Sequence, residues 1–181
     1  MWTGGGCGWG CGKDTISNEG TLIVGASSNV DSFSFDLNLL DIFKSKADLD
    51  AQAVAVGIDS GAGKDAIDNS GTISVSADAS TEAWVAEFNM VDVAIGDFSS
   101  CAGAAAVGIT SGQGKDTITN SGTITADASA DALVGNFTLT MVDLTLIPDL
   151  MDTVGGASTT VDAAALGISS GCQDDTITSS G

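Results

Sequence analysis

The stretch Gly61-Ala-Gly-Lys-Asp-Ala-Ile-Asp-Asn-Ser-Gly71 is one of four related copies in the chain, and this repeat is the strongest signal for its architecture. Successive copies begin 51, 51 and 59 residues apart. The eight extra residues of the third unit fall between Asp143 and Val161, around the only proline, and insertions of this kind lie outside a repeated framework. The copies span residues 10–20, 61–71, 112–122 and 171–181.

The repeats stay in register between these copies, and their apolar residues recur at every second position, which indicates strands. We expect four short strands in each unit, joined by Gly, Ser and Asn turns, and one longer loop. A short helix over residues 41–52 is the one helical candidate. The apolar positions that define the strands are Ile16, Ile67, Ile118 and Ile177; Leu22, Ile73 and Ile124; Leu37, Phe88 and Leu139; and Val54, Val56 and Ile58.

Like strands of successive units can pair in parallel at about 4.8 Å, so that equivalent side chains stack in columns. We therefore predict an all-β chain: one parallel β-helix, or β-solenoid, of about three and a half 51-residue repeats. A propeller and a sandwich are the alternatives, and the pattern fits one coil or two per repeat. The predicted units are residues 10–60, 61–111, 112–170 and a partial unit 171–181, after a Gly-rich segment 1–9.

The amino-acid composition excludes several classes of partner and of active site. The chain has 181 residues, 24 Asp or Glu against five Lys, no Arg and no His, for a net charge of −19. Such a balance speaks against nucleic acid and anionic membranes as partners. Without His there is no Ser-His or Cys-His pair and no His-ligated zinc. No apolar run is long enough for a membrane-spanning helix, and no signal peptide opens this numbering, so we expect no membrane insertion and a mature or excised fragment.

The pattern Ala-x-Ala-x-Gly-Ile-x-Ser-Gly-x-Gly-Lys-Asp-x-Ile-x-Asn-Ser-Gly-Thr-Ile, at residues 53–73 and broadly again at 104–124, resembles the β-helical repeats of bacterial autotransporter passengers and cell-surface adhesins. The resemblance covers nearly the whole chain. It implies an extracellular or cell-surface structural protein, not an enzyme, that serves as a stalk, adhesin or filament building block, with a cell-surface glycan as a candidate partner.

The Gly-x-Gly-Lys-Asp-x-Ile run also resembles the calcium-binding nonapeptide of repeats-in-toxin proteins, which implies Ca²⁺ as a cofactor. That family repeats every nine residues, whereas this motif occurs once per unit. The alternative is a tight Gly turn in which the Asp caps backbone amides. The residues at the matching position are Asp14, Asp65, Asp116 and Asp175.

A lysine precedes three of these aspartates: Lys13, Lys64 and Lys115. Stacked carboxylates repel one another, so we expect the lysines to neutralise the Asp column. The fourth unit has Asp174 in place of the lysine, which predicts a carboxylate without a neutralising partner and hence a cation site or a place where another chain docks.

Two further columns of polar residues recur from repeat to repeat. Asp41, Asp92 and Asp143 fit a solvated turn position, with catalytic carboxylates of a polysaccharide-active β-helix as the alternative. Asn18, Asn69 and Asn120 fit an amide ladder at a bend, hydrogen-bonded along the stack.

Cys11 and Cys172 occupy equivalent positions at opposite ends of the repeat array. They cannot meet within one stack, but end-to-end stacking of two molecules would bring them within disulfide distance. Cys7 fits a small buried thiol. Neither end shows a clear cap, which predicts either neighbouring repeats in a longer chain or head-to-tail assembly through Cys11, Cys172 and Asp174.

Overall fold

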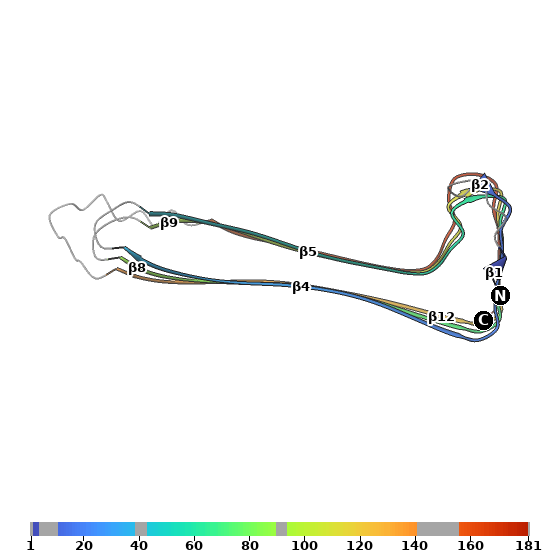
Figure 1. The fold of residues 1–181 in the computed structure, drawn as a ribbon, viewed down its shortest axis with the longest axis horizontal. Coiled ribbons are helices and arrows are strands. Elements are labelled where there is room, and N and C mark those ends of the chain that lie inside the picture. The colour runs from blue at the N-terminus through green and yellow to red at the C-terminus, as the bar shows by residue number, and fades with distance from the viewer. Residues whose placement is uncertain (1, 4–10, 39–42, 90–93, 141–155, 181) are drawn as a thin grey trace.

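The computed structural model describes residues 2–3, 11–38, 43–89, 94–140 and 156–180. None of these residues lies in a helix, and most lie in strands. The predicted parallel β-solenoid is therefore confirmed, with one coil per 51-residue repeat (Figure 1). The one helical candidate, residues 41–52, is not a helix in its described part, because residues 43–52 belong to a strand. Residues 41–42 lie outside the described part.

Each coil passes through four sheets. Two are long: β4 (Thr21–Asn38), β8 (Thr72–Asn89) and β12 (Thr123–Thr140) form one, and β5 (Phe43–Asp59), β9 (Ala94–Thr110) and β13 (Gly156–Ser169) form the other. Two are short: β2 (Cys11–Gly12), β6 (Ala62–Gly63) and β10 (Gln113–Gly114) form the third, and β3 (Thr15–Asn18), β7 (Ala66–Asn69), β11 (Thr117–Asn120) and β14 (Thr176–Ser179) lie in the fourth with β1 (Trp2–Thr3).

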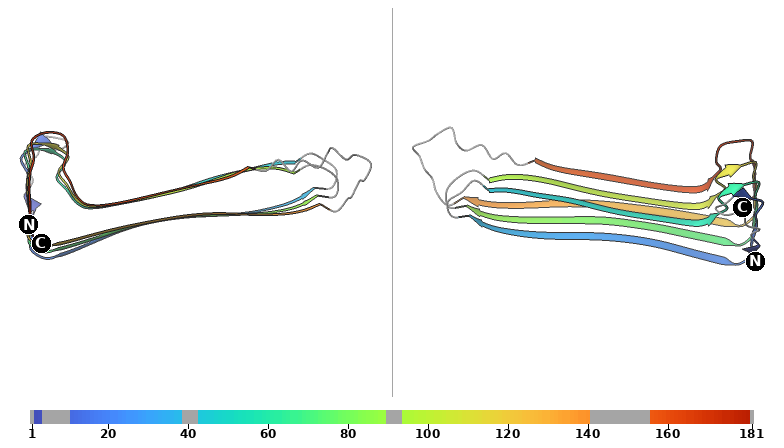
Figure 2. Two further views of the ribbon diagram at one scale, coloured as in Figure 1. Left: turned by 180° about the vertical axis from the view of Figure 1, so that it is seen from behind. Right: turned by 45° about the horizontal axis from the view of Figure 1, so that its top comes forward.

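Strand pairing follows the repeat. Ile67 pairs with Ile16 on one side and with Ile118 on the other, and Ile118 pairs with Ile177. The same 51-residue offset holds along β4, β8 and β12. Among the described strands, all pairings between coils are parallel, and only β1 pairs antiparallel, with β3. The stacked strands of each layer are seen side by side in Figure 2.

The long strands are 14 to 18 residues, where the sequence predicts short ones. At about 3.3 Å per residue the longest reach roughly 55–60 Å. The two long sheets face each other as thin layers, and the short strands form a compact head at one end (Figure 1). We use "the head" for residues 11–20, 60–71, 111–122 and 170–180.

Alanine fills the space between the long sheets. Ala51, Ala53 and Ala55 of β5 and Ala77 and Ala79 of β8 are buried there. Because these side chains are so short, Cα atoms of β8 and β9 come within 8 Å of each other, closer than the roughly 10 Å usual between packed sheets. The buried Ala column thus specifies two thin layers instead of a globule.

Val54 and Ile58, which share one alternating row in the sequence, face opposite sides of their layer. Val54 is 65% exposed on the outer face, whereas Ala55 beside it is 2% exposed in the core. The inward side changes phase at Gly57, the residue missing from the β5–β9 pairing, and Ile58 is buried again. A Cβ at position 57 would lie 2.5 Å from the carbonyl oxygen of Gly108, so only glycine fits where the chain turns into the head.

Candidate functional site

The head has a polar interior that repeats from coil to coil. Asp65, Ile67 and Asn69 point inward from the β6–β7 segment, and their equivalents Asp116, Ile118 and Asn120 do so one coil further. Alternation along the strand sends the residues between them outward. The Asp and Asn columns singled out in the sequence therefore lie inside the coil, beside the isoleucine core.

Three of the four aspartates in the Asp column cap the coil before their own. The backbone N–H groups of Asp14, Asp65 and Asp116 donate to the Oδ1 atoms of Asp65, Asp116 and Asp175 at 2.8, 2.8 and 3.0 Å, respectively. This confirms the alternative in which the Asp side chain caps backbone amides. It also explains why Asp recurs once in every repeat, because the hydrogen bond joins one coil to the next.

The second carboxylate oxygen has no such role. In the described part of the chain, the Oδ2 atoms of Asp65, Asp116 and Asp175 are buried without a hydrogen-bond partner, and Ser111 Oγ shares this condition. Asp65 and Asp116 are only 3% and 2% exposed. Buried polar atoms of this kind need a water molecule or another polar partner.

Calcium fits these residues poorly. Ca²⁺ takes six to eight oxygen ligands, from carboxylates, backbone carbonyls and water. In Asp65, Asp116 and Asp175 the Oδ1 atom is already used by a backbone amide. Among the residues that the structure describes, no three His, Cys, Asp or Glu side chains gather in a group that could hold a metal ion. The donor set of Asp14, Asp65, Asp116 and Asp175 thus suits backbone capping better than a cation.

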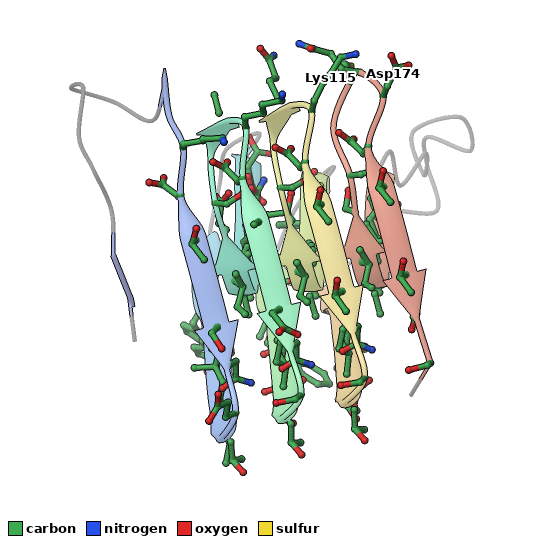
Figure 3. All side chains as sticks on the ribbon, turned by 90° about the vertical axis from the view of Figure 1, so that its right-hand side faces the viewer. Lys115 and Asp174 are labelled. Carbon is green, nitrogen blue, oxygen red and sulfur yellow. The ribbon has the colours of Figure 1, made fainter. Side chains whose placement is uncertain are left out.

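The lysines do not neutralise the Asp column, contrary to expectation. Lys64 and Lys115 precede buried aspartates, so strand alternation places them on the outer surface, where both are exposed. Lys115 Nζ instead lies 3.1 Å from Asp174 Oδ2, on the outside of the head (Figure 3). Asp174 therefore has a neutralising partner, and an ion pair this exposed contributes at most about 1 kcal/mol.

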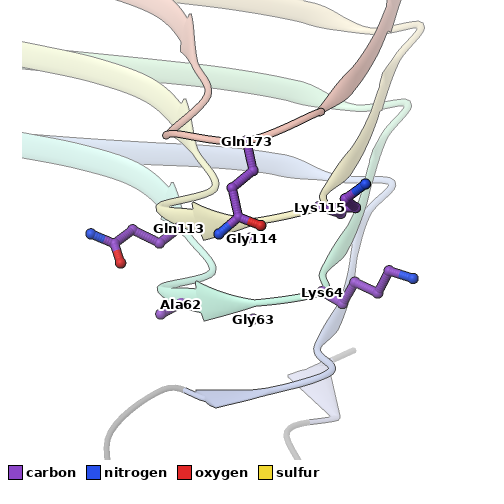
Figure 4. Close-up of a pocket in the computed structure, with 7 residues that line it drawn as sticks. All are labelled: Ala62, Gly63, Lys64, Gln113, Gly114, Lys115 and Gln173. Atoms are coloured by element: carbon purple, nitrogen blue, oxygen red, sulfur yellow. The ribbon is translucent and has the colours of Figure 1, made fainter.

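An open groove runs over the head beside these lysines (Figure 4). It is lined by Ala62, Gly63, Lys64, Gln113, Gly114, Lys115 and Gln173. Gly114 has φ +154°, and a Cβ there would lie 1.4 Å from the carbonyl oxygen of Gly63. Gln173 holds the equivalent place in the last coil with φ 134°, a strained conformation for a residue with a side chain.

The Asn column forms the predicted ladder. Asn18 Nδ2 donates to Asn69 Oδ1 at 2.7 Å, and Asn69 Nδ2 donates to Asn120 Oδ1 at 2.6 Å. Asn120 Nδ2 reaches Ser179 Oγ at 3.4 Å in the last coil. The ladder fixes the register of the head, because a slip by one residue would bury amides without partners.

The predicted assembly residues lie at opposite ends of the stack. Cys11 is in β2, an outer strand of its sheet, and its Cα pairs with Ala62. Cys172 is an exposed free cysteine shortly before β14, in the last coil at the other end of the stack. Cys101 is a free, half-buried cysteine of β9. Cys7, Asp41, Asp92 and Asp143 lie outside the described residues.

The core columns end uncovered at the last coil. Ile118 is fully buried, whereas Ile177, its partner in the next coil, is 45% exposed. Likewise Ala102 is buried, but its partner Val161 in β13 is half-exposed. In the described part of the chain, β12 and β13 each pair on one side only, and so do β4 and β5 at the opposite end.

The opposite end carries a partial cover that the sequence did not predict. Trp2 and Thr3 of β1 pair antiparallel with Ile16 and Thr15 of β3. The pairing covers two residues of the head and leaves the outer edges of β4 and β5 without a described neighbour.

An aromatic strip on the outer face of the β4–β8–β12 sheet was also missed. It consists of Phe33, Phe35, Trp84 and Leu133, all exposed large apolar side chains. These residues occupy outward positions of the alternation, next to Asp31 and Glu82. Large apolar residues in the polar phase of a strand are the signal that could have found the strip.

A comparison with protein-family models, with curated proteins and with solved structures found no match to this chain. Among the described residues, none forms a helix with the length and apolar character to cross a bilayer. The resemblance to bacterial surface repeats stays a prediction.

Proposed function

We propose that this chain is a structural repeat segment of a bacterial cell-surface or extracellular protein, a stalk, adhesin or filament building block that extends by end-to-end stacking of like strands. The observation that carries the proposal is the uncovered end of the core: Ile177 and Val161 continue buried columns yet are half-exposed. A further coil placed on them would continue the same columns.

Stacking would satisfy the backbone as well as the core. Within the described residues, β12 pairs with β8 and β13 pairs with β9 along one edge only. The N–H and C=O groups of their other edges are therefore available to a further strand in the same parallel register. A strand edge of this length is a template for another strand. The edges of β4 and β5 offer the complementary surface, since within the chain β4 pairs with β8 as β8 pairs with β12.

A non-catalytic role is supported by how the polar residues are used. The Asp column and the Asn ladder repeat in every coil and join one coil to the next. Catalytic groups would instead be expected in one coil, where they break the repeat. The extracellular setting rests on the resemblance of the Gly-x-Gly-Lys-Asp repeats to surface proteins, and an adhesin role would make a cell-surface glycan a partner.

Two substitutions in β13 test the stacking. Val161→Lys places a charge on the uncovered core column, and Leu166→Lys places the same charge on an outward position of equal exposure. We expect the native chain and the Leu166→Lys variant to form filaments or multimers in electron microscopy and sedimentation velocity, and the Val161→Lys variant to stay monomeric. Monomers for all three proteins, or equal assembly of both variants, would contradict the proposal.

A further inference from the structure

The aromatic strip has a fixed geometry. Phe33 of β4 and Trp84 of β8 are paired neighbours, and Gly135 of β12 is the next residue across the sheet. A Cβ at position 135 would lie 2.4 Å from the indole ring, so the ring of Trp84 packs over the bare backbone of Gly135. Trp84 Nε1 donates to Glu82 Oε1, which holds the ring in place. The indole therefore lies over the sheet while its residue remains 47% exposed.

The surroundings of the strip are acidic. Exposed carboxylates on the same face of the sheet belong to Asp31, Asp78, Glu82, Asp127 and Asp131. The sequences of β4, β8 and β12 contain no Lys or Arg. Glu82 of β8 is the cross-strand partner of Asp31 in β4 and of Leu133 in β12. It is also two residues from Trp84 on the same face, so carboxylates lie next to the aromatic rings. With a net charge of −19 on the chain, this face attracts cations and repels anionic polymers.

Aromatic faces beside carboxylates suit one kind of side chain in particular. A planar guanidinium stacks on an indole and donates to a neighbouring carboxylate in the same plane. We propose that the aromatic strip binds an arginine-containing basic segment of a partner protein, with guanidinium groups over Trp84 and Phe33 and hydrogen-bonded to Glu82. A neutral glycan would also stack on the rings and donate hydrogen bonds from its hydroxyls to the carboxylates, but it carries no positive charge, so charge complementarity favours the basic segment.

Binding of three probes to the full chain tests the proposal: fluorescein-labelled nona-arginine, the matching nona-lysine, and the neutral β-glucan laminarin. The variants are Trp84→Ala and Glu82→Gln. Their controls are Val54→Ala, which removes an exposed apolar side chain from the other long sheet, and Asp162→Asn, which removes an exposed carboxylate from β13. Phe33→Ala is a second strip variant, because that ring is 72% exposed and its loss does not threaten folding.

We expect nona-arginine to bind more tightly than nona-lysine in 0.15 M salt, where long-range attraction is screened. Trp84→Ala or Phe33→Ala should weaken nona-arginine binding about five- to ten-fold, and Glu82→Gln about three-fold, with little change in the two controls. Strip variants that bind like their controls would show charge attraction without a site and overturn the proposal. Laminarin binding that is lost in Trp84→Ala would overturn it in favour of a glycan platform.

Discussion

The carboxylate of Asp116 accepts the backbone N–H of Asp65 at 2.8 Å, so each repeat holds the one before it through a buried side chain. The same relationship joins Asp65 to Asp14. The aspartates that look like cation ligands in the sequence are therefore part of the solenoid framework.

Asp65→Asn should preserve this framework, because the amide oxygen can still accept the N–H of Asp14. Asp65→Ala removes the acceptor from a part-buried amide and should lower the free energy of unfolding by about 1.5–3 kcal/mol. Urea unfolding of the two variants measures the difference. Equal losses for Asn and Ala would show that the hydrogen bond contributes nothing.

Asn69→Asp should destabilise the head more than the same change at the end of the ladder. Asn69 is fully buried and donates to Asn120, and an aspartate would lose that donor and bring a charge into the ladder. We expect a loss of at least about 2 kcal/mol. Asn18→Asp is the control, since Asn18 is only half-buried in the first coil. A larger loss for Asn18→Asp in thermal unfolding would contradict the ladder.

Ala55→Leu should separate the two long sheets. Ala55 is buried between layers that leave room for a methyl group, and overpacking costs typically about 1–3 kcal/mol. Val54→Leu is the matched control, because Val54 is the next residue on the exposed face and its change should stay within about 0.5 kcal/mol. Comparable unfolding midpoints for both variants would disprove the thin alanine core.

Calcium should leave the stability of the chain unchanged. The Asp side chains are held by backbone amides through Oδ1, and the described residues bring no three His, Cys, Asp or Glu side chains together in a group that could hold a metal ion. Thermal unfolding followed by circular dichroism, with added Ca²⁺ and with a chelator, checks this directly. A midpoint raised by Ca²⁺ in the native chain but not in Asp65→Asn would show that the Asp column does bind the cation.

The stacking of the repeats is predicted well from the sequence because equivalent positions of successive repeats carry identical side chains. The Ile and Asn columns are in the predicted register, and Asp65 caps a backbone amide as its alternative interpretation held. The long strands were missed because their inward face is mostly alanine, which gives weak alternation. The sequence did not reveal that Val54 faces outward, because the inward side changes phase at Gly57. It also did not reveal that Lys64 lies away from Asp65, because adjacent residues of an extended segment point to opposite sides.

The most direct test of the coil register is a pair of engineered disulfides in a chain whose own cysteines are replaced by serine. Ser74 and Thr125 are Cα partners on the outer face of β8 and β12, so cysteines there would be about 5 Å apart and able to bond. Ser76 is one outward position further along, so Ser76→Cys with Thr125→Cys would hold its Cα atoms roughly 8 Å apart, too far for the bond. Parallel, in-register stacking predicts an intramolecular disulfide for the 74/125 pair and none for the 76/125 pair. A bond in the second pair only would contradict the parallel, in-register stacking of successive repeats.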